Sequence, residues 1–124
     1  ELSIEYNAFE SGLERFVHPS KGDFIGRAAT EKVRQEGIVT KLVYGEVAAT
    51  DCDIYGGEAV MQGDRVVGVC TSGGYGHATG KSLAFAYVAP EITEGLEVVV
   101  LGERRALTLH DAPVWDPDNA RQKA

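Results

Sequence analysis

The chain has 124 residues, of which 44% are hydrophobic and 25% charged, and its formal net charge is −7. This length suits one domain with its own hydrophobic core, and the negative charge argues against nucleic acid or an anionic membrane as the main partner. The longest apolar runs are only a few residues, so the sequence predicts neither a transmembrane span nor a signal-peptide core. Cys52 and Cys70 form no C-x-x-C motif, so we expect reduced thiols and a cytoplasmic location.

Residues 1–37 carry helix signals rather than strand signals. Asn7 followed by Glu10 has the spacing of a capping box and predicts a short helix over residues 8–16. A second helix is predicted over residues 27–36, because good helix formers precede Gly37 at the position that ends a helix. The chain starts at Glu1 without an initiator methionine and in the middle of an apparent element, so we expect it to be part of a longer protein.

From residue 38 the pattern changes to short strands. Apolar and small residues alternate with period two, and glycines or prolines separate the runs. The pair Gly63-Asp64 suits a two-residue hairpin turn of the primed type. Six evenly spaced strands predict a mainly β fold, a small six-stranded antiparallel barrel of Greek-key-like order preceded by one or two short helices. The predicted strands lie in residues 41–48, in the two arms of the hairpin 59–70, and in residues 83–88, 96–101 and 106–110.

A glycine-rich crossing joins the third and fourth predicted strands. Gly80-Lys81-Ser82 matches the end of a Walker phosphate-binding loop, but the first glycine of that motif would fall on Tyr75. The motif also needs a following helix, whereas LAFAYV reads as a strand. We therefore expect a structural connection that binds no phosphate. Its expected feature is a positive φ angle at Gly73, Gly74 or Gly76.

Two groups of residues are candidate metal ligands. The histidines stand far apart in the chain, at no metal-ligand spacing, so no metal site is predicted. The acidic group in the loop after the first strand could hold a cation or form an ordinary solvated loop, and the second is the default. The residues concerned are His18, His77, His110, Asp51, Asp53 and Glu58.

No arrangement of acid, base and nucleophile is visible, so the sequence predicts no catalytic residue, and the isolated chain is expected to fold without catalysing a reaction. Cys70 fits a packed strand cysteine better than an activated thiolate. Trp115, the single tryptophan, could cover a ligand with its ring or close one end of the barrel.

Three motifs in order resemble the C-terminal part of the aminomethyltransferase family, whose founding member is the T-protein of the glycine cleavage system. They are NAFESGLERFV, KGDFIGRAA and VVGVCTSGGYGHATGKSLAFAYV. The form FESGLERFV is most similar to the C-terminal portions of dimethylglycine and sarcosine dehydrogenases. A branch devoted to iron–sulfur cluster assembly carries K-G-C-Y-x-G-Q-E, and the absence of the cysteine and the Gln-Glu pair from residues 21–28 argues against that branch.

The resemblance implies a domain arrangement. Residues 1–37 would be a helical connection from a preceding folate-binding region, residues 38–113 the C-terminal barrel, and residues 114–124 a tail. The catalytic groups of the family belong to the preceding region, so this chain would be an accessory domain of an enzyme and would bind no cofactor alone. Lys41 and Trp115 are the residues that the resemblance places on the folate side.

The resemblance also implies a function. The longer protein would transfer one-carbon units to tetrahydrofolate, within a flavin-linked dimethylglycine or sarcosine dehydrogenase-like protein that binds FAD in an N-terminal domain. One alternative is a folate-dependent demethylase or plain aminomethyltransferase. Another is a stand-alone interaction module that has lost folate binding.

The expected partner is the preceding folate-binding region. Residues 1–37 hold more apolar side chains than two short helices need, so part of this set should face that region and could support a homodimer of the chain alone. The alternative is that these residues simply cap the barrel. The set is Leu2, Ile4, Tyr6, Phe9, Leu13, Phe16, Val17, Phe24 and Ile25.

Overall fold

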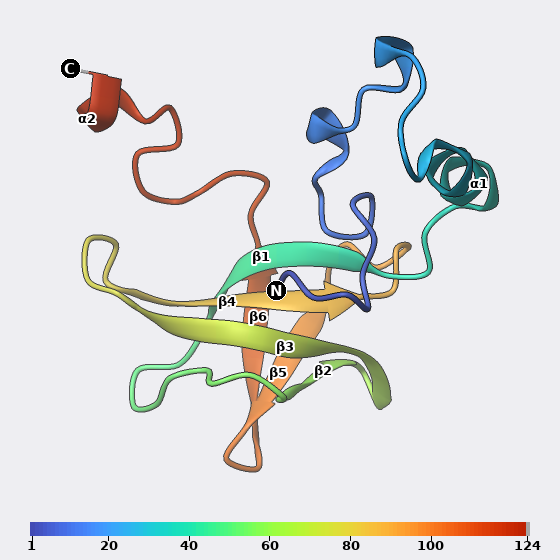
Figure 1. Ribbon diagram of the computed structural model, residues 1–124. Coiled ribbons are helices and arrows are strands. Elements are labelled where there is room, and N and C mark those ends of the chain that lie inside the picture. The colour runs from blue at the N-terminus through green and yellow to red at the C-terminus, as the bar shows by residue number, and fades with distance from the viewer. Residues whose placement is uncertain (124) are drawn as a thin grey trace.

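Six antiparallel strands close into a barrel in the computed structural model, which describes residues 1–123 (Figure 1). Their order around the barrel is β1-β4-β3-β2-β5-β6, and β6 pairs with β1 to close it. Hairpins join β2, β3 and β4, and β5 returns to lie beside β2, which is a Greek-key order. The predicted fold class is therefore confirmed. The strands are β1 (Lys41–Val47), β2 (Ala59–Gln62), β3 (Arg65–Gly76), β4 (Lys81–Val88), β5 (Leu96–Val100) and β6 (Glu103–Leu109).

The barrel interior is filled by the inward-facing residues of all six strands and by three loop residues, Ala49, Ile54 and Ile92. Ile54, from the β1–β2 loop, is 1% exposed, and Ile92, from the β4–β5 loop, is 6% exposed. Burial of these side chains supplies the main stabilisation of the barrel. The core cluster consists of Val47, Ala49, Ile54, Val60, Cys70, Ala84, Ala86, Val88, Ile92, Leu96, Val98, Val100 and Leu107.

The turn predicted at Gly63-Asp64 is present. Gln62 pairs with Arg65 across it, and Gly63 has a φ of 58°, as the first central position of a primed turn requires.

The positive φ angle expected at Gly73, Gly74 or Gly76 is absent, so that part of the prediction was wrong. Gly73, Gly74 and Gly76 lie in β3 with extended backbone, and the positive φ falls on Gly80, at 67°, in the turn before β4. Strand β3 runs past its predicted end at residue 70, as far as Gly76. A Cβ added to Gly73 would lie 2.5 Å from Cβ of Ile54, well inside van der Waals contact. Close packing, rather than an unusual backbone angle, explains this glycine.

The first predicted helix is present only in part. The capping box forms, since Asn7 Oδ1 accepts hydrogen bonds from the N–H groups of Phe9 and Glu10, and Glu10 Oε2 accepts one from the Asn7 N–H, each at 3.0 Å. Gly12 then takes a φ of 67° and ends the turn. The chain continues as a 3₁₀ turn, η1 (Glu14–Phe16), instead of a continuous helix.

The second predicted helix is confirmed as α1 (Arg27–Glu36). It ends at Gly37, whose φ is 82° and whose N–H donates to the Val33 carbonyl at 2.9 Å, the usual glycine cap. Two short elements were not predicted, η2 (Pro19–Lys21) and α2 (Ala120–Lys123). No helix among residues 1–123 is long and apolar enough to cross a membrane.

Residues 12–39, here called the arm, leave the barrel and return to it. The arm carries η1, η2 and α1, and Figure 1 shows these elements outside the barrel wall. Neither η1 nor α1 contributes a buried residue. Of the nine apolar residues noted in the sequence, five are half-buried and four are exposed: Leu2, Ile4, Phe16 and Ile25, at 67, 105, 64 and 105%.

Leu101→Asn is expected to stabilise the chain by about 0.5–1 kcal/mol. Leu101 is 89% exposed and has a φ of 51°, and Gly102 has a φ of 85°, so the turn between β5 and β6 needs two left-handed residues. Asparagine tolerates that conformation better than leucine. Urea unfolding measures the change. Leu101→Ala removes the same exposed side chain, but alanine does not tolerate the left-handed conformation as asparagine does, so this variant should not gain comparable stability. Equal urea midpoints for the two variants would contradict the explanation.

Candidate functional site

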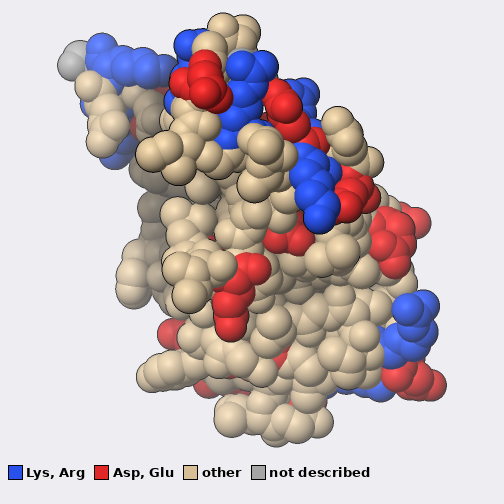
Figure 2. All heavy atoms as spheres, turned by 45° about the vertical axis from the view of Figure 1, so that its right-hand side comes forward, with Lys and Arg blue, Asp and Glu red and all other residues tan. Residues whose placement is uncertain are grey.

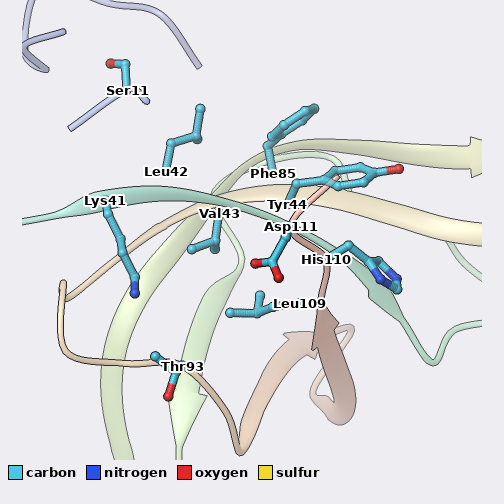
Figure 3. A pocket seen from close by; sticks show the side chains of 10 residues that line it. All are labelled: Ser11, Lys41, Leu42, Val43, Tyr44, Phe85, Thr93, Leu109, His110 and Asp111. Carbon is cyan, nitrogen blue, oxygen red and sulfur yellow. The ribbon is translucent and has the colours of Figure 1, made fainter. Parts of the chain in front are cut away.

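A hollow of about 570 Å³ opens beside β1 on the wall of the barrel (Figure 3). In Figure 3 the side chains of Lys41 and Asp111 lie on the same side of β1 as Leu109, while Ser11 lies on the other side. The lining residues are Ser11, Lys41, Leu42, Val43, Tyr44, Phe85, Thr93, Leu109, His110 and Asp111.

The hollow exists because β6 ends before β1 does. In the register of the two strands, Gly45 of β1 pairs with Leu109 of β6, so the first four residues of β1 extend beyond the end of β6. The His110 N–H still donates to the Tyr44 carbonyl at 2.9 Å. One step further, the Leu42 N–H donates to the Glu10 carbonyl at 2.7 Å, so the N-terminal segment takes over the edge that β6 leaves open.

Two aromatic rings stand at the centre of this outer surface. Tyr44 of β1 and Phe85 of β4 are cross-strand partners whose ring centroids are 5.1 Å apart. A second hollow of about 400 Å³ and a third of about 270 Å³ are also lined by both residues, so three hollows meet at this pair. In Figure 2 charged side chains gather at the top of the view, and much of the surface below them is uncharged. Aromatic residues next to pockets are enriched among the residues that dominate binding at protein interfaces.

A small polar group borders the aromatic pair. Glu46 Oε1 accepts from Lys81 Nζ at 2.7 Å, and Glu46 Oε2 lies 3.9 Å from Nε2 of His110. That histidine nitrogen is buried and has no hydrogen-bond partner among the described residues. The histidine ring centroid lies 6.2 Å from that of Tyr44. The group can orient a polar atom of an incoming partner.

The two residues placed on the folate side by resemblance do not come together. Lys41 lines the 570 Å³ hollow, and no ion pair holds it among residues 1–123. Trp115 is 48% exposed and lines none of the three hollows that meet at the aromatic pair. Instead, the guanidinium of Arg121 stacks over its ring, 4.8 Å from the centroid.

The acidic loop after β1 is held by local pairing. Asp51 Oδ1 lies 2.9 Å from Arg105 Nη1, and this hydrogen-bonded pairing lowers the pKa of Asp51. Glu58 accepts hydrogen bonds from the N–H groups of Tyr55 and Gly56, both at 2.8 Å. Asp51 and Glu58 therefore have structural roles. Among the described residues, no group of three or more His, Cys, Asp or Glu side chains could hold a metal ion.

Both cysteines are free, as expected. Burial, with a smaller contribution from Glu58, raises the pKa of Cys70 to about 12. The pKa of Cys52 is also raised, first by desolvation and then by the negative charge of Asp51. Cys70, 2% exposed, is the packed strand cysteine that the sequence predicted.

We therefore expect slow alkylation of both thiols at pH 8, because a raised pKa lowers the fraction of reactive thiolate. In the folded chain, iodoacetamide should modify half-buried Cys52 more slowly than a free cysteine and leave Cys70 unmodified; in urea both should react. Mass spectrometry of quenched samples measures this. Rapid modification of Cys70 in the folded chain would contradict the packing described.

The sequence did not point to Tyr44 or Phe85, and it singled out His110 only as a candidate metal ligand. Period-two alternation around Phe85 was visible, but the pairing of Phe85 with Tyr44 joins residues 41 positions apart in the chain. The place where β6 ends relative to β1 decides where the hollow lies, and that register is also a long-range property.

Comparison with known proteins gives three kinds of match. Residues 40–116 match the family of the glycine cleavage T-protein C-terminal barrel domain. The chain is 38% identical over 127 aligned residues to mouse mitochondrial dimethylglycine dehydrogenase, covering 99% of the chain and 15% of that protein. An aminomethyltransferase from Koribacter versatilis is 40% identical over 91 residues, covering 73% of the chain and 24% of that protein.

Two further matches bear on the fold and on the range of relatives. The crystal structure of the glycine cleavage system aminomethyltransferase T from Bartonella henselae has a TM-score of 0.77 and 23% sequence identity, covering 89% of the chain and 32% of that chain. The gamma subunit of a heme-dependent oxidative N-demethylase from Ectopseudomonas mendocina is 32% identical, covering 94% of the chain and 31% of that protein.

Proposed function

The chain belongs to the glycine cleavage T-protein C-terminal barrel family, and from this membership we propose that it is the accessory C-terminal domain of a tetrahydrofolate-dependent one-carbon-transfer enzyme. The observation that carries the proposal is the match to dimethylglycine dehydrogenase, which extends over 99% of the chain. The chain spans about a seventh of that relative and about a quarter of the aminomethyltransferase. The catalytic groups are accordingly assigned to a preceding folate-binding region.

We assign the longer protein to the flavin-linked type. In that type an FAD domain oxidises an N-methyl amine, and the folate-binding region receives the one-carbon unit. Similarity to mouse dimethylglycine dehydrogenase covers residues on both sides of residue 40, whereas the barrel family match begins at residue 40. The arm and the barrel together therefore have a counterpart in dimethylglycine dehydrogenase.

The side chains of residues 1–123 fit only part of tetrahydrofolate. A complete site would enclose the pterin ring between hydrogen-bonding groups and would bind the carboxylates of the glutamate tail with a cation. Lys41 offers a cation at the 570 Å³ hollow, and the neighbouring aromatic pair offers apolar contact. No described group encloses a pterin, so no step of the transfer is assigned to this chain. Lys41 is the stronger of the two candidate contacts, since Arg121 covers one face of the Trp115 ring.

The aromatic pair of Tyr44 and Phe85, with the hollows around it, is proposed as the surface that contacts the preceding region. A plain aminomethyltransferase without flavin is the main alternative, supported by the Koribacter versatilis relative. An oxidative N-demethylase is a further one, supported by the Ectopseudomonas mendocina relative.

Purification of the longer protein tests the function. We expect a flavin absorption band, bleaching of that band by dimethylglycine or sarcosine, and formation of 5,10-methylenetetrahydrofolate when tetrahydrofolate is present. Folate product without flavin would favour the plain aminomethyltransferase. If the longer protein contained no flavin and formed no folate product, the proposed function would be contradicted and an interaction module would be favoured.

A further inference from the structure

Tyr87 is an outward-facing residue of β4 that is nevertheless 2% exposed. Its cross-strand partner Leu42 and the other wall residues around it do not bury it; the N-terminal segment does. The ring of Tyr6 stacks on that of Tyr87 with centroids 3.6 Å apart and an interplanar angle of 14°. One wall tyrosine thus binds a segment about 80 residues away in the sequence.

The hydroxyl of Tyr87 is fully used in this contact. It donates to the Glu1 carbonyl at 3.1 Å and accepts from the Ser11 hydroxyl at 2.8 Å. Ser11 and its neighbour Glu10 are 7 and 6% exposed, and the Glu10 carbonyl accepts from the Leu42 N–H. The segment is therefore fixed to β4 by side chains and to β1 by its backbone.

The arm begins directly after this contact and ends beside it. At the far end of the arm, Thr40 Oγ1 donates to the Val88 carbonyl at 3.0 Å. Tyr87 and Val88 are adjacent residues of β4, so both ends of the arm are tied to one point of the barrel wall. Between these ties, neither η1 nor α1 contains a buried residue, and Phe16 and Ile25 are exposed.

We propose that Tyr87 is a positioning residue for one-carbon transfer: it clamps the N-terminal segment so that the arm projects at a fixed angle against the folate-binding region. The proposal rests on the proposed function. We assign the folate-binding region as the partner on which the arm docks. Similarity to dimethylglycine dehydrogenase includes the arm, and most of that relative lies outside the part matched here. Fixing both ends in advance lowers the conformational entropy lost when the arm docks.

The clamp itself is tested by amide hydrogen exchange on residues 1–124, a chain in which all six strands pair. Tyr87→Phe removes two hydrogen bonds and keeps the ring, and Tyr6→Ala removes the stack without altering the barrel. Both should speed exchange of the Leu42 N–H by about tenfold or more, and leave the Val98 amide of β5 unchanged. Tyr55→Phe, at a residue 90% exposed, is the matched control and should change neither.

The positioning role is tested in the longer protein. Tyr87→Phe and Tyr6→Ala should leave the rate of amine oxidation unchanged and lower the share of one-carbon units recovered on tetrahydrofolate several-fold, with the remainder released by hydrolysis as formaldehyde. Unchanged Leu42 exchange, or unchanged folate product despite faster exchange, would overturn the proposal. Absence of folate product in the unmodified protein would instead contradict the proposed function.

Discussion

Gly73→Ala is expected to lower the free energy of unfolding of the chain by about 2–3 kcal/mol, the usual cost of forcing extra volume into a packed core. The new Cβ would meet Cβ of Ile54 at 2.5 Å, the Leu83 carbonyl oxygen at 2.7 Å and the Ile54 carbonyl oxygen at 2.9 Å. Two of these atoms belong to the backbone, so a rotamer change cannot relieve the contact. Either the β1–β2 loop moves and Ile54 leaves the core, or the pairing of β3 with β4 loosens.

Gly74→Ala is the matched control, since it is the next residue of the same strand. A Cβ at Gly74 meets nothing within 4 Å, and its expected effect stays within about 0.5 kcal/mol. Urea unfolding followed by circular dichroism gives both values. Equal effects at the two positions would show that backbone freedom, rather than contact with Ile54, explains the glycines of β3.

Phe85→Glu is expected to weaken binding between this chain and the preceding folate-binding region by about 2–4 kcal/mol, or roughly 30- to 1000-fold. Phe85 is 37% exposed and lines all three hollows that meet at the aromatic pair. Docking would desolvate a glutamate at this position without providing it with a partner. The barrel itself should stay folded because the side chain lies outside the core.

Calorimetric titration of the separately produced preceding region with the chain measures the loss. Val66→Glu is the control: Val66 is 66% exposed on β3 and lines none of the three hollows. It should bind like the unmodified chain. If the Phe85→Glu chain bound the preceding region with unchanged affinity, the aromatic pair would not be part of the docking surface.

Local signals in the sequence were sufficient for the architecture. Period-two alternation identified all six strands, and Gly37 and Gly63 marked the end of α1 and the turn between β2 and β3. The capping box at Asn7 was also correct, yet it did not fix the length of the helix. Gly12 takes a left-handed conformation and stops the turn after the box, and propensity alone does not show whether a glycine will continue or end a helix.

Contacts distant in the sequence were not predictable in the same way. Gly73 was interpreted through backbone freedom because its real neighbour, Ile54, belongs to a loop that precedes it by 19 residues. Tyr87 was seen as a strand residue, but its burial depends on Tyr6 and Ser11. Lys41 was placed on the folate side by resemblance, and the structure adds that it lines a hollow.

Equilibrium binding of tetrahydrofolate, measured side by side on residues 1–124 and on the longer protein, tests the central claim most directly. The claim is that this barrel supports a folate enzyme without holding a complete folate site. We expect saturable binding to the longer protein, weakened by Lys41→Ala, and no saturable binding to residues 1–124. Saturable binding of tetrahydrofolate to residues 1–124 alone, or none to the longer protein, would contradict it.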